Sequence, residues 1–344
     1  MTNFCSKSLT FGKNSLFDVA FIILGGLPFY LPYLFFLGEA GLRANIPFDW
    51  AFWGNQVVSM PHVWATYARL TRKIGEGKVN FLFGAPAYIA VVAFLIVASL
   101  NGFFLEAMTA VNVWQSFHYL RQVYGISRYF ARPDSESDFE RKLSFWAYHL
   151  AMPLFIIGRW NMLYIYWHGK PSDAIIPVGF PAPLLTALYI LAGVGLAVGL
   201  YLELLKYRRL ANGSAKQYDC SGLLTLLVYF AIHWFGFLSI QFYFIGFITV
   251  TIFHAVQYLA ISWHFEEMQS TTNIFTAKAL KALPTLASFA AFWLVVYLIG
   301  DFAQSVLMPM GNSFYPKFAM VCLSSVSAHH YLVDTVLWGR KAGI

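Results

Sequence analysis

The sequence has few charged residues, and this scarcity separates it from ordinary soluble domains. Only 11% of its 344 residues are charged, whereas a typical soluble domain has about 25%. Apolar residues make up 59% and aromatic residues 19%. The apolar residues come in blocks of about 20, the length that an α-helix needs to cross a hydrocarbon core of about 30 Å. The composition therefore predicts an all-α, polytopic integral membrane protein.

Cysteine is scarce as well, and its spacing excludes the usual sites built from cysteine. Cys5, Cys220 and Cys322 lie far apart and form no C-x-x-C pair. Such a pattern gives neither a disulfide framework nor a zinc site. The formal net charge is +7, but the basic residues lie between the apolar blocks rather than on one segment. They are typical of topology signals, so we expect no nucleic-acid partner.

Ten transmembrane helices fit the apolar blocks, and we expect them to form a single transmembrane domain over residues 1–344. The first contains Pro28 and Pro32, which predict a kink. Between the fourth and fifth, the charged segment Arg132–Lys142 is predicted to be a solvated connection. The expected spans are Ser15–Leu37, Phe48–Leu70, Phe81–Leu100, Glu106–Phe130, Leu143–Trp167, Pro183–Leu205, Gly222–Ile240, Phe242–Phe265, Leu283–Leu307 and Phe318–Trp338.

The basic residues indicate the orientation of this layout. With the N-terminus inside, only Arg43, Lys170 and Lys317 fall in external segments, and Arg159 falls within a span. All the other lysines and arginines are cytoplasmic in this layout, which is the bias expected of inward-facing loops. We therefore expect both termini to be cytoplasmic. The protein would lie in the cytoplasmic (inner) membrane if it is bacterial.

Four of the expected helices carry a histidine ten residues before a polar or basic residue at the cytoplasmic end. Ten residues of helix rise about 15 Å, roughly half of the hydrocarbon thickness, so the four histidines lie at similar depth. Ionisable groups at that depth are costly and face a protein interior or a wet cavity. We expect a shared site in the mid-to-cytoplasmic half of the bilayer. The pairs are His62 with Arg72, His118 with Arg128, His254 with His264, and His330 with Arg340.

Clustered neutral imidazoles without cysteine favour iron, copper or zinc. We prefer iron with open positions for O2, because only the stripe of His330 contains a carboxylate that zinc hydrolysis could use as a base. Ligating histidines normally donate their second N–H to a carboxylate or amide. Asp334, Gln115 and Gln257 are candidates for that role. Tyr258, on the same helical face as His254, is a further candidate catalytic residue.

Other histidines extend the candidate ligand set. His329 and His330 are neighbours whose side chains diverge by about 100° on a helix, so we expect one of them to point inward. His149, in the cytoplasmic half of the fifth span, could join the site. His264 lies near the cytoplasmic interface. These additional histidines could hold a second metal ion.

The four histidines lie in short motifs, which are SMPHVW (Ser59–Trp64), QSFHYL (Gln115–Leu120), TIFHAVQY (Thr251–Tyr258) and SAHHYLVD (Ser327–Asp334). These motifs resemble those of the Brp/Blh-type membrane β-carotene oxygenases. The resemblance implies cleavage of a carotenoid with O2 at a histidine-bound iron. It also implies that His62, His118, His254 and His329 are the ligands, whereas the spacing argument favours His330.

This chain departs from the family pattern at three positions. The family has an acidic residue after each of the first two histidines, where this chain has Thr66 and Val123 nearby. The third motif of the family has a second histidine one turn further on, where this chain has Tyr258. The resemblance therefore supports a metal-dependent membrane oxygenase more than it supports carotenoid cleavage.

The sequence thus predicts a membrane-embedded, histidine-ligated non-haem iron oxygenase. Its substrate would be a lipophilic molecule from the bilayer, such as a carotenoid, a lipid or an alkyl chain. One alternative is a di-iron membrane desaturase or hydroxylase, which would use a second metal ion and an electron-donor protein. A non-enzymatic alternative is a b-type haem or quinone-linked electron carrier, or a transporter.

Overall fold

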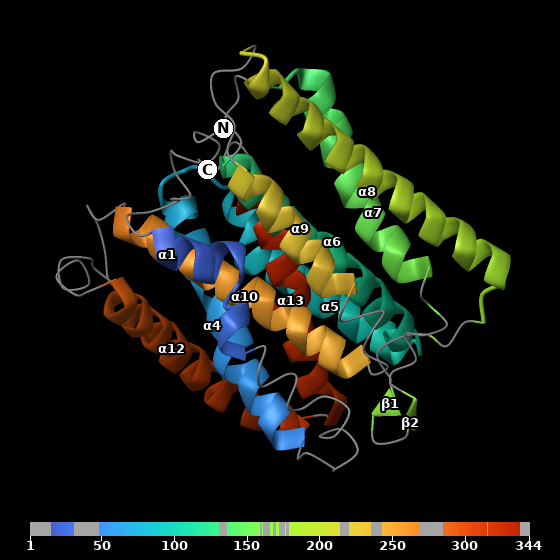
Figure 1. Cartoon of the computed structure of the whole chain (residues 1–344). Coiled ribbons are helices and arrows are strands. Elements are labelled where there is room, and N and C mark those ends of the chain that lie inside the picture. The colour runs from blue at the N-terminus through green and yellow to red at the C-terminus, as the bar shows by residue number, and fades with distance from the viewer. Residues whose placement is uncertain are drawn as a thin grey trace. The chain divides into compact units, whose positions relative to one another are not determined.

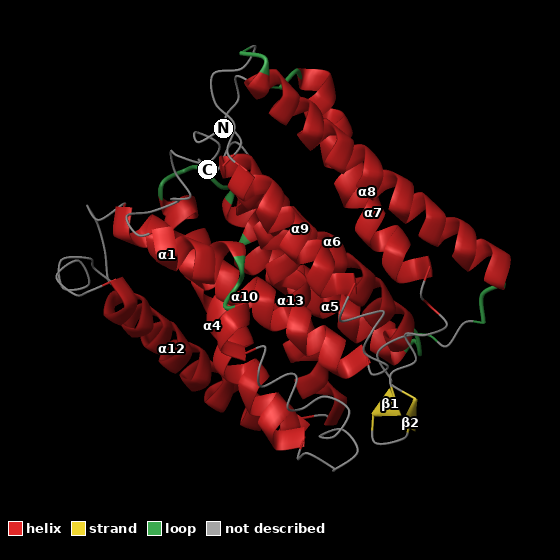
Figure 2. Cartoon of the chain, viewed as in Figure 1, coloured by secondary structure: helices red, strands yellow, loops and turns green. Residues whose placement is uncertain are grey.

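The computed structural model is almost entirely helical in the residues that it describes (Figures 1 and 2). Two strands of two residues each are the exception in these residues. The all-α prediction is therefore confirmed. The described residues are 15–30, 48–130, 136–158, 160, 166–167, 170–171, 176, 179–213, 220–234, 243–268, 285–314 and 316–337.

The described residues fall into two compact units. The middle unit lies within Ala98–Phe247, and the terminal unit lies within Thr10–Val97 and Ile248–Ile344. Contacts within each unit define this division, and the expectation of a single membrane domain stays a prediction.

Most of the terminal unit is built from long helices. In this unit α4 packs against α12 and α13, and α12 also packs against α13. A small apolar core of Leu70, Val79, Val333 and Leu337 joins α4 to α13. The elements are α1 (Ser15–Phe17), the π-helix η1 (Asp18–Ile23), α4 (Phe48–Gly75), the 3₁₀ turn η2 (Phe81–Phe83), α5 (Ala85–Leu100), α10 (Tyr243–Met268), α12 (Thr285–Phe314) and α13 (Pro316–Leu337).

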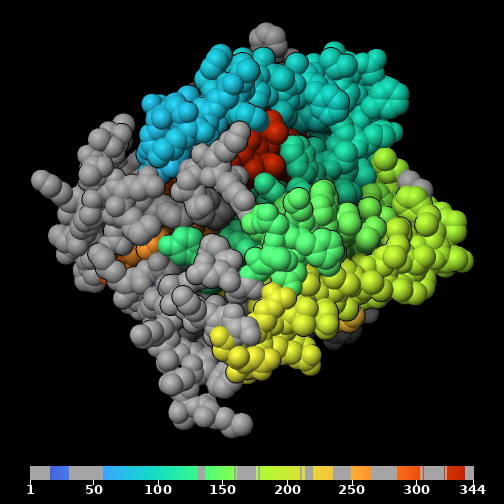
Figure 3. Space-filling view, turned by 90° about the horizontal axis from the view of Figure 1, so that it is seen from above, coloured from blue at the N-terminus to red at the C-terminus, as the bar shows by residue number. Residues whose placement is uncertain are grey.

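The middle unit contains α6 (Phe104–Phe130), α7 (Asp138–Gly158), α8 (Ala182–Ala211) and α9 (Cys220–Trp234). The helices α7 and α8 lie against each other (green to yellow in Figure 3). A Cβ atom at Gly195 of α8 would lie 2.9 Å from the carbonyl oxygen of Ala147 in α7. Glycine at this position therefore lets the two helices approach closely, as small residues do in membrane bundles.

Two of the expected spans differ from the observed helices. In the first, the break comes at Gly25 and Gly26, whose φ angles are +53° and +74°, and so before Pro28. A Cβ atom at Gly25 would lie 2.3 Å from the Phe253 ring, so only glycine fits there. In the fifth, α7 ends at Gly158. Residues from the expected end of that span form β1 (Tyr166–Trp167), which pairs antiparallel with β2 (Lys170–Pro171).

Three segments of these helices are long and apolar enough to cross a membrane. They are Phe81–Leu100, Ala182–Arg209 and Thr285–Phe302. Large apolar side chains on all three are exposed, including Phe94, Ile190 and Leu298, as expected for surfaces that contact lipid. The remaining expected spans, the orientation of the termini and the depth of the site stay predictions.

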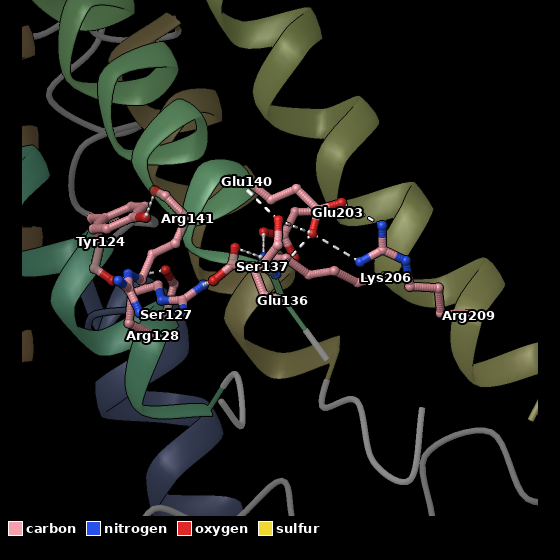
Figure 4. A network of polar contacts seen from close by, with 10 residues as sticks. All are labelled: Tyr124, Ser127, Arg128, Glu136, Ser137, Glu140, Arg141, Glu203, Lys206 and Arg209. Carbon is pink, nitrogen blue, oxygen red and sulfur yellow. Dashed lines mark hydrogen bonds and ion pairs between the residues drawn. The ribbon is translucent and has the colours of Figure 1, made fainter. Parts of the chain in front are cut away.

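Ser137, Asp138 and Lys142 of the charged connection before α7 are exposed, as predicted for a solvated segment, whereas Glu136 forms ion pairs through a buried side chain (Figure 4). The Glu136 side chain is only 2% exposed and lies 2.5 Å from Arg128 of α6 and 3.0 Å from Lys206 of α8. Lys206 is also 2% exposed and lies 2.5 Å from Glu203. Two cations and two anions therefore form a balanced, buried chain of ion pairs, which joins the connection to α6 and α8.

Helix α7 begins with a reciprocal cap that its sequence encodes. The Ser137 hydroxyl accepts a hydrogen bond from the Glu140 backbone N–H (3.2 Å), and the Glu140 carboxylate accepts one from the Ser137 backbone N–H (2.9 Å). This S-x-x-E pattern satisfies two backbone donors that a helix start leaves free. Glu140 also accepts hydrogen bonds from Arg209 of α8, so one carboxylate both caps α7 and binds α8 (Figure 4).

Glu140 gives a pH-dependent prediction. The Arg209 hydrogen bond holds the pKa of Glu140 at about 2, below its ordinary value of 4.5, although burial acts in the opposite direction. A lowered folded-state pKa means that the carboxylate stabilises the fold above pH 4.5 and loses this effect as the pH falls towards 2. Thermal unfolding in detergent should show a steeper loss of stability over this range for the wild type than for Glu140→Gln. Asp138→Asn is the control, because Asp138 is mostly exposed; equal pH profiles for the wild type and Glu140→Gln would contradict the prediction.

Candidate metal centre

Helix α4 carries His62 directly after a proline. Pro61 has no N–H, so the carbonyl of Val57 one turn earlier lacks its helical partner. The Trp293 indole of α12 donates a hydrogen bond to that carbonyl at 2.8 Å. A neighbouring helix thus satisfies the freed carbonyl. The contact fixes α12 to α4 one turn before His62.

Three histidines from three helices of the terminal unit meet in its interior. His62 of α4, His254 of α10 and His330 of α13 are all buried. The Nε2 atoms of His62 and His330 are 3.0 Å apart. The ring of His254 lies 5.0 Å from that of His62, measured between ring centroids. A nitrogen–nitrogen contact this short requires the two rings to share either a proton or a cation.

Asp334 adds a buried carboxylate to the three histidines. It lies one turn after His330 on α13, and its Oδ2 is 3.9 Å from the His330 Nε2. Its Oδ1 accepts a hydrogen bond from the Thr66 hydroxyl of α4 at 3.3 Å. Ligand atoms of His254, His330 and Asp334 lie within 4.8 Å of one another. A buried histidine and aspartate cluster that could hold a metal ion is therefore present in this unit.

His329 and His330 have different surroundings. The His329 Nε2 donates to the carbonyl oxygen of Phe83 at 2.9 Å. Its Nδ1 then accepts a hydrogen bond from the Tyr67 hydroxyl at 3.1 Å, because a neutral imidazole has one donor and one acceptor nitrogen. Both ring nitrogens of His329 are therefore engaged away from the cluster, whereas His330 points into it.

His118, His149 and His264 are the remaining histidine candidates. His118 and His149 are buried in the middle unit, on α6 and α7. The His149 Nδ1 donates to the Phe145 carbonyl at 2.7 Å, and its ring stacks on the Phe145 ring. His264 is buried on α10, ten residues after His254, which corresponds to about 15 Å of helix. His264 therefore does not share one ion with His254.

The two glutamine candidates form hydrogen bonds with groups other than histidine. Gln115 donates to the Tyr119 hydroxyl at 2.6 Å within α6. Gln257 donates to the Ile22 carbonyl at 2.6 Å and so attaches the π-helix to α10. That π-helix and its bonding to α10 are not visible in the apolar pattern of the sequence. The orienting roles expected for Gln115 and Gln257 stay predictions.

Tyr258 lies at the histidine cluster, as expected from its place one turn after His254. Its side chain is fully buried. The centroid of its ring is 5.9 Å from that of His62, 6.2 Å from that of His330 and 6.5 Å from that of His254. The cluster therefore combines three imidazoles, one carboxylate and one adjacent phenol.

The sequence analysis did not assign a role to Thr66. It is buried, and its hydroxyl contacts both the His62 carbonyl (3.1 Å) and the Asp334 carboxylate (3.3 Å). The signal was present, because Thr66 lies four residues after His62 on the same helical face. Its partner on α13 could not be identified without the packing of α4 against α13.

No protein-family model, curated protein or solved structure matches the chain. The resemblance to the membrane β-carotene oxygenases therefore stays an expectation from the four motifs.

Proposed function

We propose that the chain is a membrane-embedded non-haem iron oxygenase whose metal site is built from His62, His254, His330 and Asp334. The observation that carries the proposal is the convergence of three buried imidazoles and a carboxylate from α4, α10 and α13. The ligand role expected for His118, a residue of the middle unit, stays a prediction.

The residues suit a metal ion of this class. Imidazole nitrogens bind first-row metals at about 2.0–2.1 Å, and two nitrogens on one such ion are then about 3 Å apart. The Nε2 atoms of His62 and His330 have this separation, 3.0 Å. Imidazoles combined with a carboxylate, without thiolate, are typical of non-haem iron oxygenases. The donor set therefore favours iron over metals that prefer sulfur.

Iron, when bound, supplies the binding and activation of O2. The chain supplies the surroundings. The cluster is buried, since His62, His254, His330, Asp334 and Tyr258 are each at most 5% exposed. Thr66 holds one carboxylate oxygen of Asp334, which fixes the orientation of that group beside His330. A lipophilic substrate, such as a carotenoid, a lipid or another alkyl chain, would reach the site from the bilayer that the apolar helices contact.

The di-iron alternative receives no support from the described residues. A second ion would need histidines outside the cluster. The Nδ1 of His149 already donates to the Phe145 carbonyl, and His264 lies about 15 Å further along α10 than His254. Both ring nitrogens of His329 already form hydrogen bonds. A single metal ion is accordingly our proposal.

Metal analysis and isotope incorporation test the proposal together. The full chain is purified in detergent and loaded with Fe(II) under anaerobic conditions, and bound metals are then measured. We expect one iron per chain and no Soret band of a haem. With ¹⁸O2 and a panel of carotenoids and fatty acyl lipids, we expect ¹⁸O in the oxidised product. A protein that binds no stoichiometric transition metal, or a Soret band in place of non-haem iron, would overturn the proposal.

A further inference from the structure

Tyr258 lies beside the three histidines of the cluster. Its ring lies at nearly equal distances from the rings of His62, His254 and His330. Its hydroxyl oxygen is buried. Tyr258 and His254 are one turn apart on α10, so a single helical face brings a nitrogen and a phenolic oxygen to the same place.

The Asp334 carboxylate and the Tyr258 phenol affect which charge state of a bound iron ion is stabilised. A carboxylate and a phenolate are anionic oxygen donors, and anionic donors stabilise a trivalent ion more than a divalent one, because the Coulomb attraction increases with the charge of the ion. The site excludes water, so this effect is larger than it would be at a surface. A phenol placed here is therefore matched to ferric iron.

We propose that Tyr258 is a ligand of the iron and binds through its phenolic oxygen. On binding, the phenolic O–H bond breaks, an oxygen–iron bond forms, and the proton leaves to solvent; no electron is transferred in this step. The donor set then contains three imidazoles, the Asp334 carboxylate and the Tyr258 phenolate. This inference rests on the proposed metal site and adds to it a ligand that the four short motifs did not assign.

Ferric tyrosinate has an optical signature, and the experiment uses it. The full chain is purified in detergent, loaded with Fe(II) and oxidised with ferricyanide, and its visible absorption and resonance Raman spectra are recorded. We expect a tyrosinate-to-iron charge-transfer band in the visible range. The ring vibrations enhanced by that band should shift when the protein is produced with ring-deuterated tyrosine. This labelling identifies tyrosine ligation in the unmodified chain, independently of whether any variant folds.

Variants then identify the tyrosine. Tyr258→Phe should lose the band while retaining its iron. Tyr67→Phe is the matched control, because Tyr67 contacts His329 rather than the cluster, and it should keep the band. An iron-loaded wild type without the band, or a band that persists in Tyr258→Phe, overturns the ligand assignment but leaves the iron site standing. Failure of the wild type to bind iron overturns both proposals.

Discussion

Replacing His330 with alanine is expected to weaken iron binding by more than about 100-fold, whereas replacing His329 leaves the ion bound. Loss of a partner that only orients a ligand costs about 10- to 100-fold in metal affinity, and loss of a ligand costs more. The His330 Nε2 faces the His62 Nε2 at 3.0 Å, and Asp334 is one turn away. The adjacent His329 directs its nitrogens to Phe83 and Tyr67.

The two neighbours form a matched pair of variants. His329→Ala removes two hydrogen bonds and leaves the partly buried carbonyl of Phe83 without this partner, which should cost about 1 kcal/mol of stability. It therefore serves as a destabilised protein that still binds iron. Iron titration under anaerobic conditions and thermal unfolding in detergent measure the two effects separately.

The opposite pattern would have a clear meaning. If His329→Ala loses the ion and His330→Ala retains it, the ligand set follows the motif alignment and the arrangement around His62 is wrong. If both variants retain the ion, the cluster is not the metal site. Circular dichroism of each variant establishes that it is folded before either conclusion is drawn.

Replacing Lys206 with methionine is expected to destabilise the chain by about 3–5 kcal/mol, the usual cost of removing one partner from a buried ion pair. Lys206 lies between Glu136 and Glu203, and all three side chains are buried. Without the ammonium group, the carboxylates of Glu136 and Glu203 lose the cation that lies between them.

A double variant distinguishes charge imbalance from lost packing. Lys206→Met combined with Glu203→Leu removes one cation and one anion and leaves the Arg128–Glu136 pair intact. Since balanced replacement of a buried pair by apolar residues is often nearly neutral, this variant should recover most of the stability. Asp138→Asn changes an exposed ion pair and should cost less than about 1 kcal/mol. Unfolding in a denaturing detergent series measures the stability of each variant. If Lys206→Met is within about 1 kcal/mol of the wild type, the ion pairs of Lys206 do not stabilise the fold as predicted.

Much of the candidate site could be predicted from the sequence because helical geometry is regular. Each of His62, His254 and His330 lies ten residues before a polar or basic residue, and this spacing predicted a common depth for the three histidines. The choice between His329 and His330 could not be made in this way. It depends on which face of α13 meets α4, and that is decided by side chains such as Tyr67 and Val333, which lie far from each other in the sequence.

The burial of charged side chains was the feature hardest to predict from the sequence. The segment around Glu136 is acidic and polar, which is typical of a solvated connection. The burial of the Glu136 side chain is explained by its ion pair with Lys206 of α8. The hydrogen-bond partner of the carbonyl that Pro61 frees could not be predicted from the sequence either. A proline predicts that the carbonyl of Val57 is freed, but nothing local identifies Trp293 as the group that binds it.

The hydrogen bonds between α4 and α13 have a consequence for the metal-free protein. Thr66 with Asp334 and Tyr67 with His329 connect the two helices without using any ion. The ligands are therefore preorganised, unlike those of zinc fingers, whose folding waits for the metal. An apoprotein prepared with a chelator should keep its helices in place and take up iron again without refolding. The speed of metal exchange would then be governed by access through the bilayer-facing helices rather than by assembly of the site.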